Sequence, residues 1–129
     1  MNELNVTAKL FLLLGSANAA LAVTLGAFGA HALKARLDDA LMKVYQTGIE
    51  YHFYHALGLI LVGIIAMNLP VNTWLKSAGW MMFLGIILFC GSLYLLSILN
   101  LRWLGMITPL GGLLFILSWS SLFIAIAKD

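Results

Sequence analysis

The side chains best suited to chemistry lie close together between Gln46 and His55. Within these ten residues the chain places one carboxylate, two imidazoles and two phenols (Glu50, Tyr51, His52, Tyr54 and His55), and an apolar run, 56–67, follows at once. Ionisable groups at the edge of membrane-spanning sequence are costly, and proteins retain them mainly at sites that bind ligands, move protons or pair with another charge. The segment is therefore the first candidate for a functional site.

The composition is that of a membrane protein and not of a soluble one. Of its 129 residues 63% are hydrophobic and only 9% are charged, whereas a soluble domain has about 25% charged residues. The sequence predicts an all-α integral membrane protein with a single transmembrane domain over 1–129. A net charge of +2 without a basic cluster excludes nucleic acid as a partner.

Charged residues divide the chain into four uncharged stretches of about 25 residues each, and about 20 residues cross the hydrocarbon core as a helix. We expect a four-helix bundle with spans at roughly 8–31, 49–69, 74–99 and 102–127. Between the first two spans, leucines at helical spacing in 32–48 predict a short amphipathic helix lying flat in the headgroup region. Gly48 is expected to separate that helix from the second span.

Several small residues and one proline have a predicted structural role. Pro109 cannot donate a backbone hydrogen bond, so a kink is expected there inside the fourth span. Glycines allow helices to approach closely in membranes, and the glycines of the motifs described below are Gly26, Gly29, Gly48, Gly91, Gly111 and Gly112.

Four spans place both termini on one side of the membrane and the 32–48 and 100–102 connections on the other. Counted from the helix ends at 1.5 Å per residue, His55, Tyr94 and Thr108 share a layer roughly 7–9 Å deep, and Asn18 lies deeper. The sequence therefore predicts a one-sided polar pocket floored by the kink at Pro109. The predicted pocket or binding residues are Asn18, His31, Glu50, His55, Tyr94, Arg102 and Thr108.

Three interpretations of these residues remain open. In the first, Glu50 pairs with Arg36 or Arg102 and His55 bonds to a neighbouring helix. In the second, the pocket binds a ligand or handles protons. In the third, three histidines (His31, His52 and His55) bind a metal or haem, although no cysteine or second carboxylate supports that site. No nucleophile–base pair is evident, so we expect no enzyme, no catalytic residues, no metal and no cofactor.

These interpretations lead to competing functions. The leading hypothesis is a non-enzymatic membrane protein that serves in assembly, or that binds lipid or a small amphiphile. Its rival is a small transporter or channel component that uses Asn18, Glu50 and His55 along a path, and a weaker alternative is a haem or metal-binding redox subunit. Membrane lipid is the expected partner, and a homo-oligomer or another membrane protein is left open.

Four motifs resemble those of a known family. They are Gly26–His31, Gln46–Tyr51 with His55, Gly91–Tyr94 and Thr108–Gly112, in that order. The chain is similar in them to the YgdD-type family of small four-span bacterial inner-membrane proteins, which has similar small mitochondrial proteins and no assigned activity. The resemblance implies a multi-pass protein of the bacterial inner membrane with cytoplasmic termini. His52 is not a motif position, which weakens the metal hypothesis.

Overall fold

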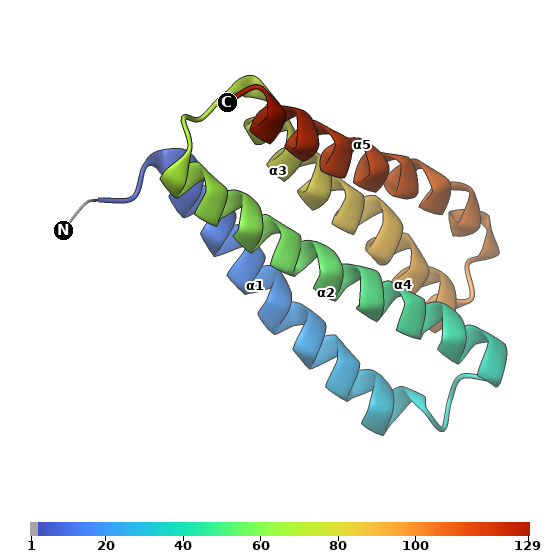
Figure 1. Cartoon of the computed structure of the whole chain (residues 1–129). Coiled ribbons are helices and arrows are strands. Elements are labelled where there is room, and N and C mark those ends of the chain that lie inside the picture. Colours follow the sequence, from blue (N-terminus) through green and yellow to red (C-terminus); the bar gives the residue numbers. More distant parts are fainter. Residues whose placement is uncertain (1–2) are drawn as a thin grey trace.

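A computed structural model describes residues 3–129 as a set of long helices without strands (Figure 1). Four continuous helical rods, each 26 to 30 residues long, are apolar and long enough to cross a membrane: Val6–Leu33, Asp39–Asn68, Thr73–Leu99 and Arg102–Ala127. Within these rods the α-helices are α1 (Val6–Phe28), α2 (Asp39–Asn68), α3 (Thr73–Gly85), α4 (Gly91–Leu99) and α5 (Thr108–Ala127). Two π-helical turns, η1 (Gly29–Leu33) and η2 (Ile86–Cys90), and a 3₁₀ helix, η3 (Arg102–Met106), complete them.

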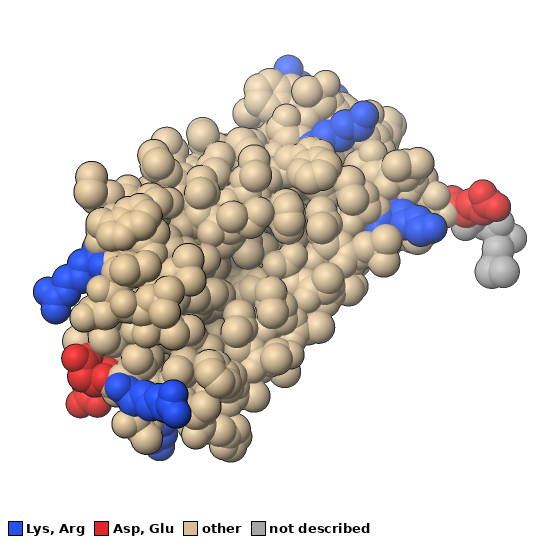
Figure 2. All heavy atoms as spheres, turned by 180° about the vertical axis from the view of Figure 1, so that it is seen from behind, with Lys and Arg blue, Asp and Glu red and all other residues tan. Residues whose placement is uncertain are grey.

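The charged side chains mark the two ends of the rods. Figure 2 shows Lys, Arg, Asp and Glu gathered near the ends of the molecule, with an uncharged band between them. The C-terminus and the connection between α2 and α3 lie at one end, together with the N-terminal start of α1 (Figure 1). The α1–α2 turn and the α4–η3 turn lie at the other end, as an even number of spans requires. The predicted all-α, four-span fold is confirmed.

Two details of the prediction are wrong, and both concern where helices begin. The segment 32–48 does not contain a separate interfacial helix: η1 continues α1 to Leu33, a short turn follows, and α2 runs unbroken from Asp39. Asp38 caps α2 by accepting the backbone N–H of Leu41 at 2.8 Å, which is the usual role of aspartate before a helix. Gly48 lies inside α2, and the ring of Tyr94 occupies the space that a side chain would need. A Cβ there would lie 2.9 Å from Tyr94 Cε1.

The expected mid-helix kink at Pro109 is likewise absent, because Pro109 occupies the first turn of α5. The first amides of a helix have no intrahelical partner, so the missing N–H of proline costs little there. The 3₁₀ helix η3 ends just before, at Met106, and Ile107 leads into α5 with helical dihedral angles. Asn100 makes the preceding turn with φ of 54°, a left-handed conformation that asparagine tolerates.

The helices pack mainly in two pairs, α1 with α2 and α3 with α5, and α2 also packs along α3, η2 and α4. At the end that carries the termini, an asparagine joins the two helices within each pair. Asn5 caps α1 and donates to Ala66 O at 2.8 Å, and Asn72 caps α3 and donates to Ala125 O at 3.4 Å. By contrast, α2 and α5 run apart for most of their length.

Glycines set the closest approaches between the rods. Gly29 lies under the ring of Tyr45, where a Cβ would come within 2.3 Å of Cε1, and Gly111 faces the backbone of Phe89, where a Cβ would lie 2.4 Å from the amide nitrogen. Gly26 and Gly112 make only ordinary contacts, and Gly91 has no neighbour within 4 Å of its Cβ position. Close packing therefore explains Gly29, Gly48 and Gly111, but not Gly91.

Candidate functional site

A chain of hydrogen bonds crosses the interior between three helices. Tyr94 Oη of α4 lies 2.8 Å from His52 Nδ1 of α2, and His52 Nε2 lies 2.9 Å from Asn18 Oδ1 of α1. The Asn18 amide then donates to Leu14 O at 2.8 Å. His52 and Asn18 are buried, with exposed fractions of 1% and 8%, so the bond between these two side chains forms away from competing solvent.

The chemistry of the partners fixes the direction of this chain. The Leu14 carbonyl only accepts, so Asn18 must turn its NH₂ toward Leu14 and its oxygen toward His52. That oxygen only accepts, so His52 carries its proton on Nε2, and in the neutral imidazole Nδ1 then accepts the hydroxyl proton of Tyr94. Every polar atom of the three side chains is thereby used with His52 neutral.

His55 is held in the opposite tautomer. Its Nδ1 lies 2.8 Å from the carbonyl oxygen of Tyr51 and must donate to it, while Nε2 accepts the indole N–H of Trp119 at 3.0 Å. The imidazole also stacks on Phe115, with ring centroids 3.5 Å apart and planes 8° from parallel. His55 thus joins α2 to α5 across the space between them, as predicted for a histidine bonded to a neighbouring helix.

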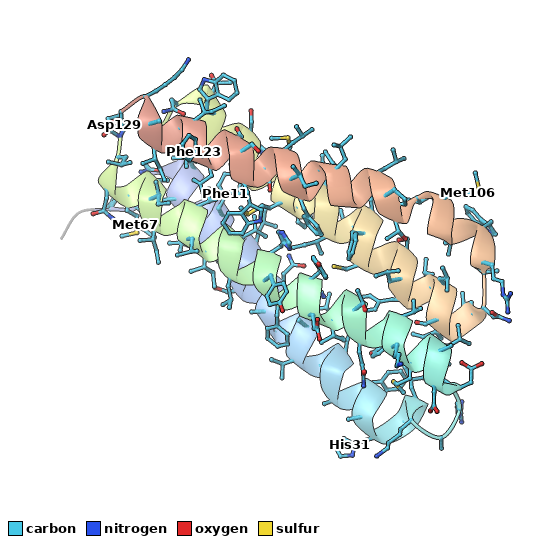
Figure 3. All side chains as sticks on the ribbon, turned by 45° about the vertical axis from the view of Figure 1, so that its right-hand side comes forward. Phe11, His31, Met67, Met106, Phe123 and Asp129 are labelled. Atoms are coloured by element: carbon cyan, nitrogen blue, oxygen red, sulfur yellow. The ribbon has the colours of Figure 1, made fainter. Side chains whose placement is uncertain are left out.

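These bonds affect the metal hypothesis. A histidine binds a metal through a free nitrogen lone pair, and the lone pairs of both His52 and His55 already accept hydrogen bonds. No group of three or more His, Cys, Asp or Glu side chains that could hold a metal occurs within residues 3–129. His31 lies at the outer end of the first rod and points away from the helices (Figure 3).

A groove of about 780 Å³ opens between α2 and α5 beside His55. Aromatic side chains form most of its wall, and Phe89 and Phe115 face Tyr51 at centroid distances of 4.8 and 6.4 Å. The lining residues are Tyr51, Tyr54, His55, Phe89, Pro109, Gly112, Leu113, Phe115, Ile116 and Trp119. Because Tyr54, Leu113 and Ile116 are exposed, the groove opens sideways, toward the surface that faces lipid.

The seven predicted pocket residues do not share one cavity. Asn18 and Tyr94 meet through His52, Thr108 bonds to Ser92 with oxygens 2.6 Å apart, and His55 borders the α2–α5 groove. His31, Glu50 and Arg102 are exposed. Within residues 3–129 no salt bridge joins Glu50 to Arg36 or Arg102, and Glu50 instead borders a second groove beside Lys34 and Asp39.

The predicted pocket residues did not include His52, which lies at the centre of the hydrogen-bond chain. The signal that identifies it is the spacing of small and apolar residues along α2. Gly48, His52, Ala56, Leu59, Gly63 and Ala66 recur every three or four positions and are all buried, which places His52 on the packed face of the helix. The aromatic groove was not foreseen either, since Trp119 and Phe115 are distant from His55 in the sequence.

Buried apolar side chains from all four rods form one cluster, which extends from the middle of the molecule toward the end that carries the termini. The buried polar side chains at that end, Ser118 and Ser121, donate to backbone carbonyls. The cluster comprises Ala8, Phe11, Leu59, Val62, Ala66, Leu75, Ala78, Met82, Ile86, Cys90, Phe115, Leu122 and Ala125. Phe11 and Phe123, at this end of the molecule, are labelled in Figure 3.

Four apolar rods with a satisfied polar network inside them define a helical, multi-span membrane protein. Comparison with known proteins agrees, because residues 25–112 match the family model described as "Protein of unknown function (DUF423)". The chain belongs to this family, whose curated members carry the name UPF0382 membrane proteins. The expected small membrane family without an assigned activity is thus supported, whereas the YgdD-type name is not.

Relatives match nearly the whole chain. The UPF0382 membrane protein YwdK of Bacillus subtilis is 51% identical over 120 residues, which cover 93% of this chain and 98% of that protein. The UPF0382 membrane proteins SH2409 of Staphylococcus haemolyticus and SERP0230 of Staphylococcus epidermidis are each 46% identical over 120 residues, covering 93% of this chain and 97% of theirs. No solved structure matches the chain.

Proposed function

We propose that this protein is a non-enzymatic membrane protein that binds a lipid or small amphiphile in the groove between α2 and α5. The observation that carries the proposal is the groove itself, about 780 Å³ of space along two helices that otherwise pack closely against their neighbours. A groove of this size suits a drug-sized ligand or a stretch of acyl chain. Its sideways opening supports entry from the bilayer.

The chemistry of the wall supports an occupant that is mainly apolar with a small polar group. Phe89, Phe115 and the ring of His55 present flat faces against which a chain or ring can pack. Tyr51 and Tyr54 are exposed, and no hydrogen bond from either hydroxyl is found within residues 3–129. These phenols provide donors for a carbonyl, ester or hydroxyl oxygen at the edge of the groove.

The two histidines support the proposal by holding the groove open. His52 links α2 to α1 and α4, and the bond from Trp119 to His55 sets the spacing between α2 and α5. Side chains that are fixed by hydrogen bonds lose little entropy when a ligand arrives. His52 therefore acts on binding indirectly, through helix position.

The rival functions find less support in the geometry. A transporter requires a wet path past Asn18, but the buried cluster around Phe11, Leu59 and Met82 is apolar. A haem or metal subunit requires free histidine lone pairs, and those of His52 and His55 are engaged. We place the protein in the bacterial inner membrane with cytoplasmic termini, which the motif resemblance supports, and the bacterial relatives are named as membrane proteins.

Native mass spectrometry of the full chain, released gently from bacterial membranes, tests the proposal. We expect one lipid or amphiphile to remain bound, and the substitution Gly112→Leu to reduce its retention about tenfold by filling the groove. A Cβ at Gly112 meets the Phe89 ring only at 3.8 Å, so the fold should accept the change. Gly91→Leu, at an open position outside the groove, is the matched control. Equal retention in both variants, or none in the unaltered chain, would refute the proposal.

A further inference from the structure

A second groove lies between the last turns of the first rod and the first turns of α2, and it differs in character from the α2–α5 groove. It encloses about 480 Å³. Small residues of the first rod, Gly26, Gly29 and Ala30, form its floor, and side chains of α2 form the opposite wall. Figure 2 shows acidic and basic side chains next to one another at this end of the molecule.

Charges of both signs line this groove. Lys34 stands at its outer end, Asp39 and Glu50 border it from α2, and Gln46 lies one turn before Glu50. All four side chains are exposed, and within residues 3–129 no salt bridge or side-chain hydrogen bond engages any of them. The groove thus offers one cation, two carboxylates and an amide to an external molecule.

The groove also lies at the depth of lipid headgroups. About 20 residues cross the hydrocarbon core, and counting them from Lys9 along the first rod ends at Gly29. Counting back from Asn68 along α2 ends at Gly48. Gly29 lines the groove, and Gly48 lies at the same level of α2 as the lining residues Gln46 and Ile49, so hydrocarbon gives way to headgroups at this level.

We propose that this groove binds the headgroup of a zwitterionic phospholipid that carries a primary amine. The ammonium group donates hydrogen bonds, which Glu50 and the Gln46 carbonyl, one turn apart on α2, can accept, and the phosphate pairs with Lys34. An anionic headgroup without an amine gives Glu50 no cation to pair with. A quaternary ammonium satisfies the charges but has no N–H to donate. The site is separate from the α2–α5 groove and does not depend on the function proposed there.

The test measures retention of defined lipids by native mass spectrometry. The delipidated full chain in detergent is mixed with phosphatidylethanolamine, phosphatidylcholine or phosphatidylglycerol of identical acyl chains. We expect phosphatidylethanolamine to be retained about tenfold more than either other lipid, which is the difference expected from one charge-assisted hydrogen bond. Equal or greater retention of phosphatidylglycerol would overturn the proposal, as would the retention of no lipid.

Variants locate the bound headgroup. Glu50→Gln should remove most of the preference for phosphatidylethanolamine over phosphatidylcholine. Lys34→Gln should lower the retention of both lipids by the same factor. Glu3→Gln and Lys76→Gln make the same changes at the opposite end of the molecule and should have no effect on lipid retention.

Since Glu50 is exposed, its variant should melt at the same temperature as the unaltered chain without lipid. An unchanged lipid preference in folded Glu50→Gln would contradict the assignment. If only Gly112→Leu lost the preference for phosphatidylethanolamine, the lipid would bind in the α2–α5 groove and the assignment would be wrong.

Discussion

His52 Nε2 lies 2.9 Å from Asn18 Oδ1, so the interior of an apolar protein contains a polar bond between its first two spans. The bond continues through His52 Nδ1 to Tyr94 Oη at 2.8 Å, and one imidazole therefore fixes three rods relative to one another. Hydrogen bonds between membrane helices contribute about 0.6–2 kcal/mol each. Hydrogen bonds are directional, so they also specify which helix faces meet. Apolar packing is less directional and specifies those faces less strictly.

The first prediction concerns the loss of this bond. Asn18→Ala leaves the Nε2–H of His52 without its partner in the buried interior, and an unsatisfied buried donor costs about 1–3 kcal/mol. We expect the melting temperature in detergent to fall clearly. Asn68→Ala is the matched control, because the exposed Asn68 amide donates only to Ile64 O on its own helix. Equal melting temperatures for the two variants would show that the bond contributes nothing.

The second prediction concerns the contact between Gly29 and Tyr45. Gly29→Ala introduces a Cβ that would lie 2.3 Å from Tyr45 Cε1, and overpacking of this kind costs about 1–3 kcal/mol. Gly26→Ala, one turn earlier in the helix, places its Cβ 3.7 Å from Ile49, an ordinary contact. Thermal unfolding in detergent should show a destabilised Gly29→Ala and a Gly26→Ala as stable as the unaltered chain or more so. The reverse order would contradict the packing described here.

The third prediction concerns the histidine tautomers. ¹⁵N NMR of the histidine-labelled protein should show two neutral imidazoles of opposite kind, with the proton on Nε2 in His52 and on Nδ1 in His55. Trp119→Phe removes the donor to His55 Nε2 and should shift the resonance of that nitrogen while leaving His52 unchanged. Two identical tautomers would rule out the hydrogen-bond directions assigned above.

The fourth prediction concerns the dryness of the interior. Cys90 is fully buried in the apolar cluster, and a thiol must reach water to react as the thiolate. N-ethylmaleimide should leave Cys90 unmodified in the folded protein and modify it after denaturation. As a control, Lys43→Cys in a Cys90→Ser background places a thiol at an exposed position of α2 and should react at once. Rapid labelling of Cys90 would indicate a wet path and would favour the transporter.

The sequence was sufficient to predict the spans because the cost of burying charge in hydrocarbon is large and local. Charges spaced about 25 residues apart left one arrangement of four helices, and the same count placed both termini at one end. The start of α2 was missed because a glycine such as Gly48, considered alone, is typical of a helix break. Its compensation, the ring of Tyr94, comes from a residue 46 positions later.

The candidate site was less predictable, because pairwise contacts between distant residues decide it. Asn18 was predicted as a pocket residue and bonds to α2, but its partner His52 is not one of the predicted pocket residues. Glu50 and Arg102 were grouped by depth alone. Depth gives no information about rotation around a helix, and both side chains prove to be exposed. Trp119, the partner of His55, carries no local signal that distinguishes it from an interfacial tryptophan.

Photo-crosslinking tests the central claim, that an amphiphile occupies the α2–α5 groove, most directly. The full chain in native membranes is incubated with a phospholipid that carries a diazirine on its acyl chain, irradiated and mapped by peptide mass spectrometry. We predict that adducts concentrate on groove residues such as Tyr54, Leu113 and Ile116, and that Gly112→Leu abolishes this concentration while Gly91→Leu preserves it. Adducts spread evenly over the lipid-facing residues of all four rods would contradict the claim.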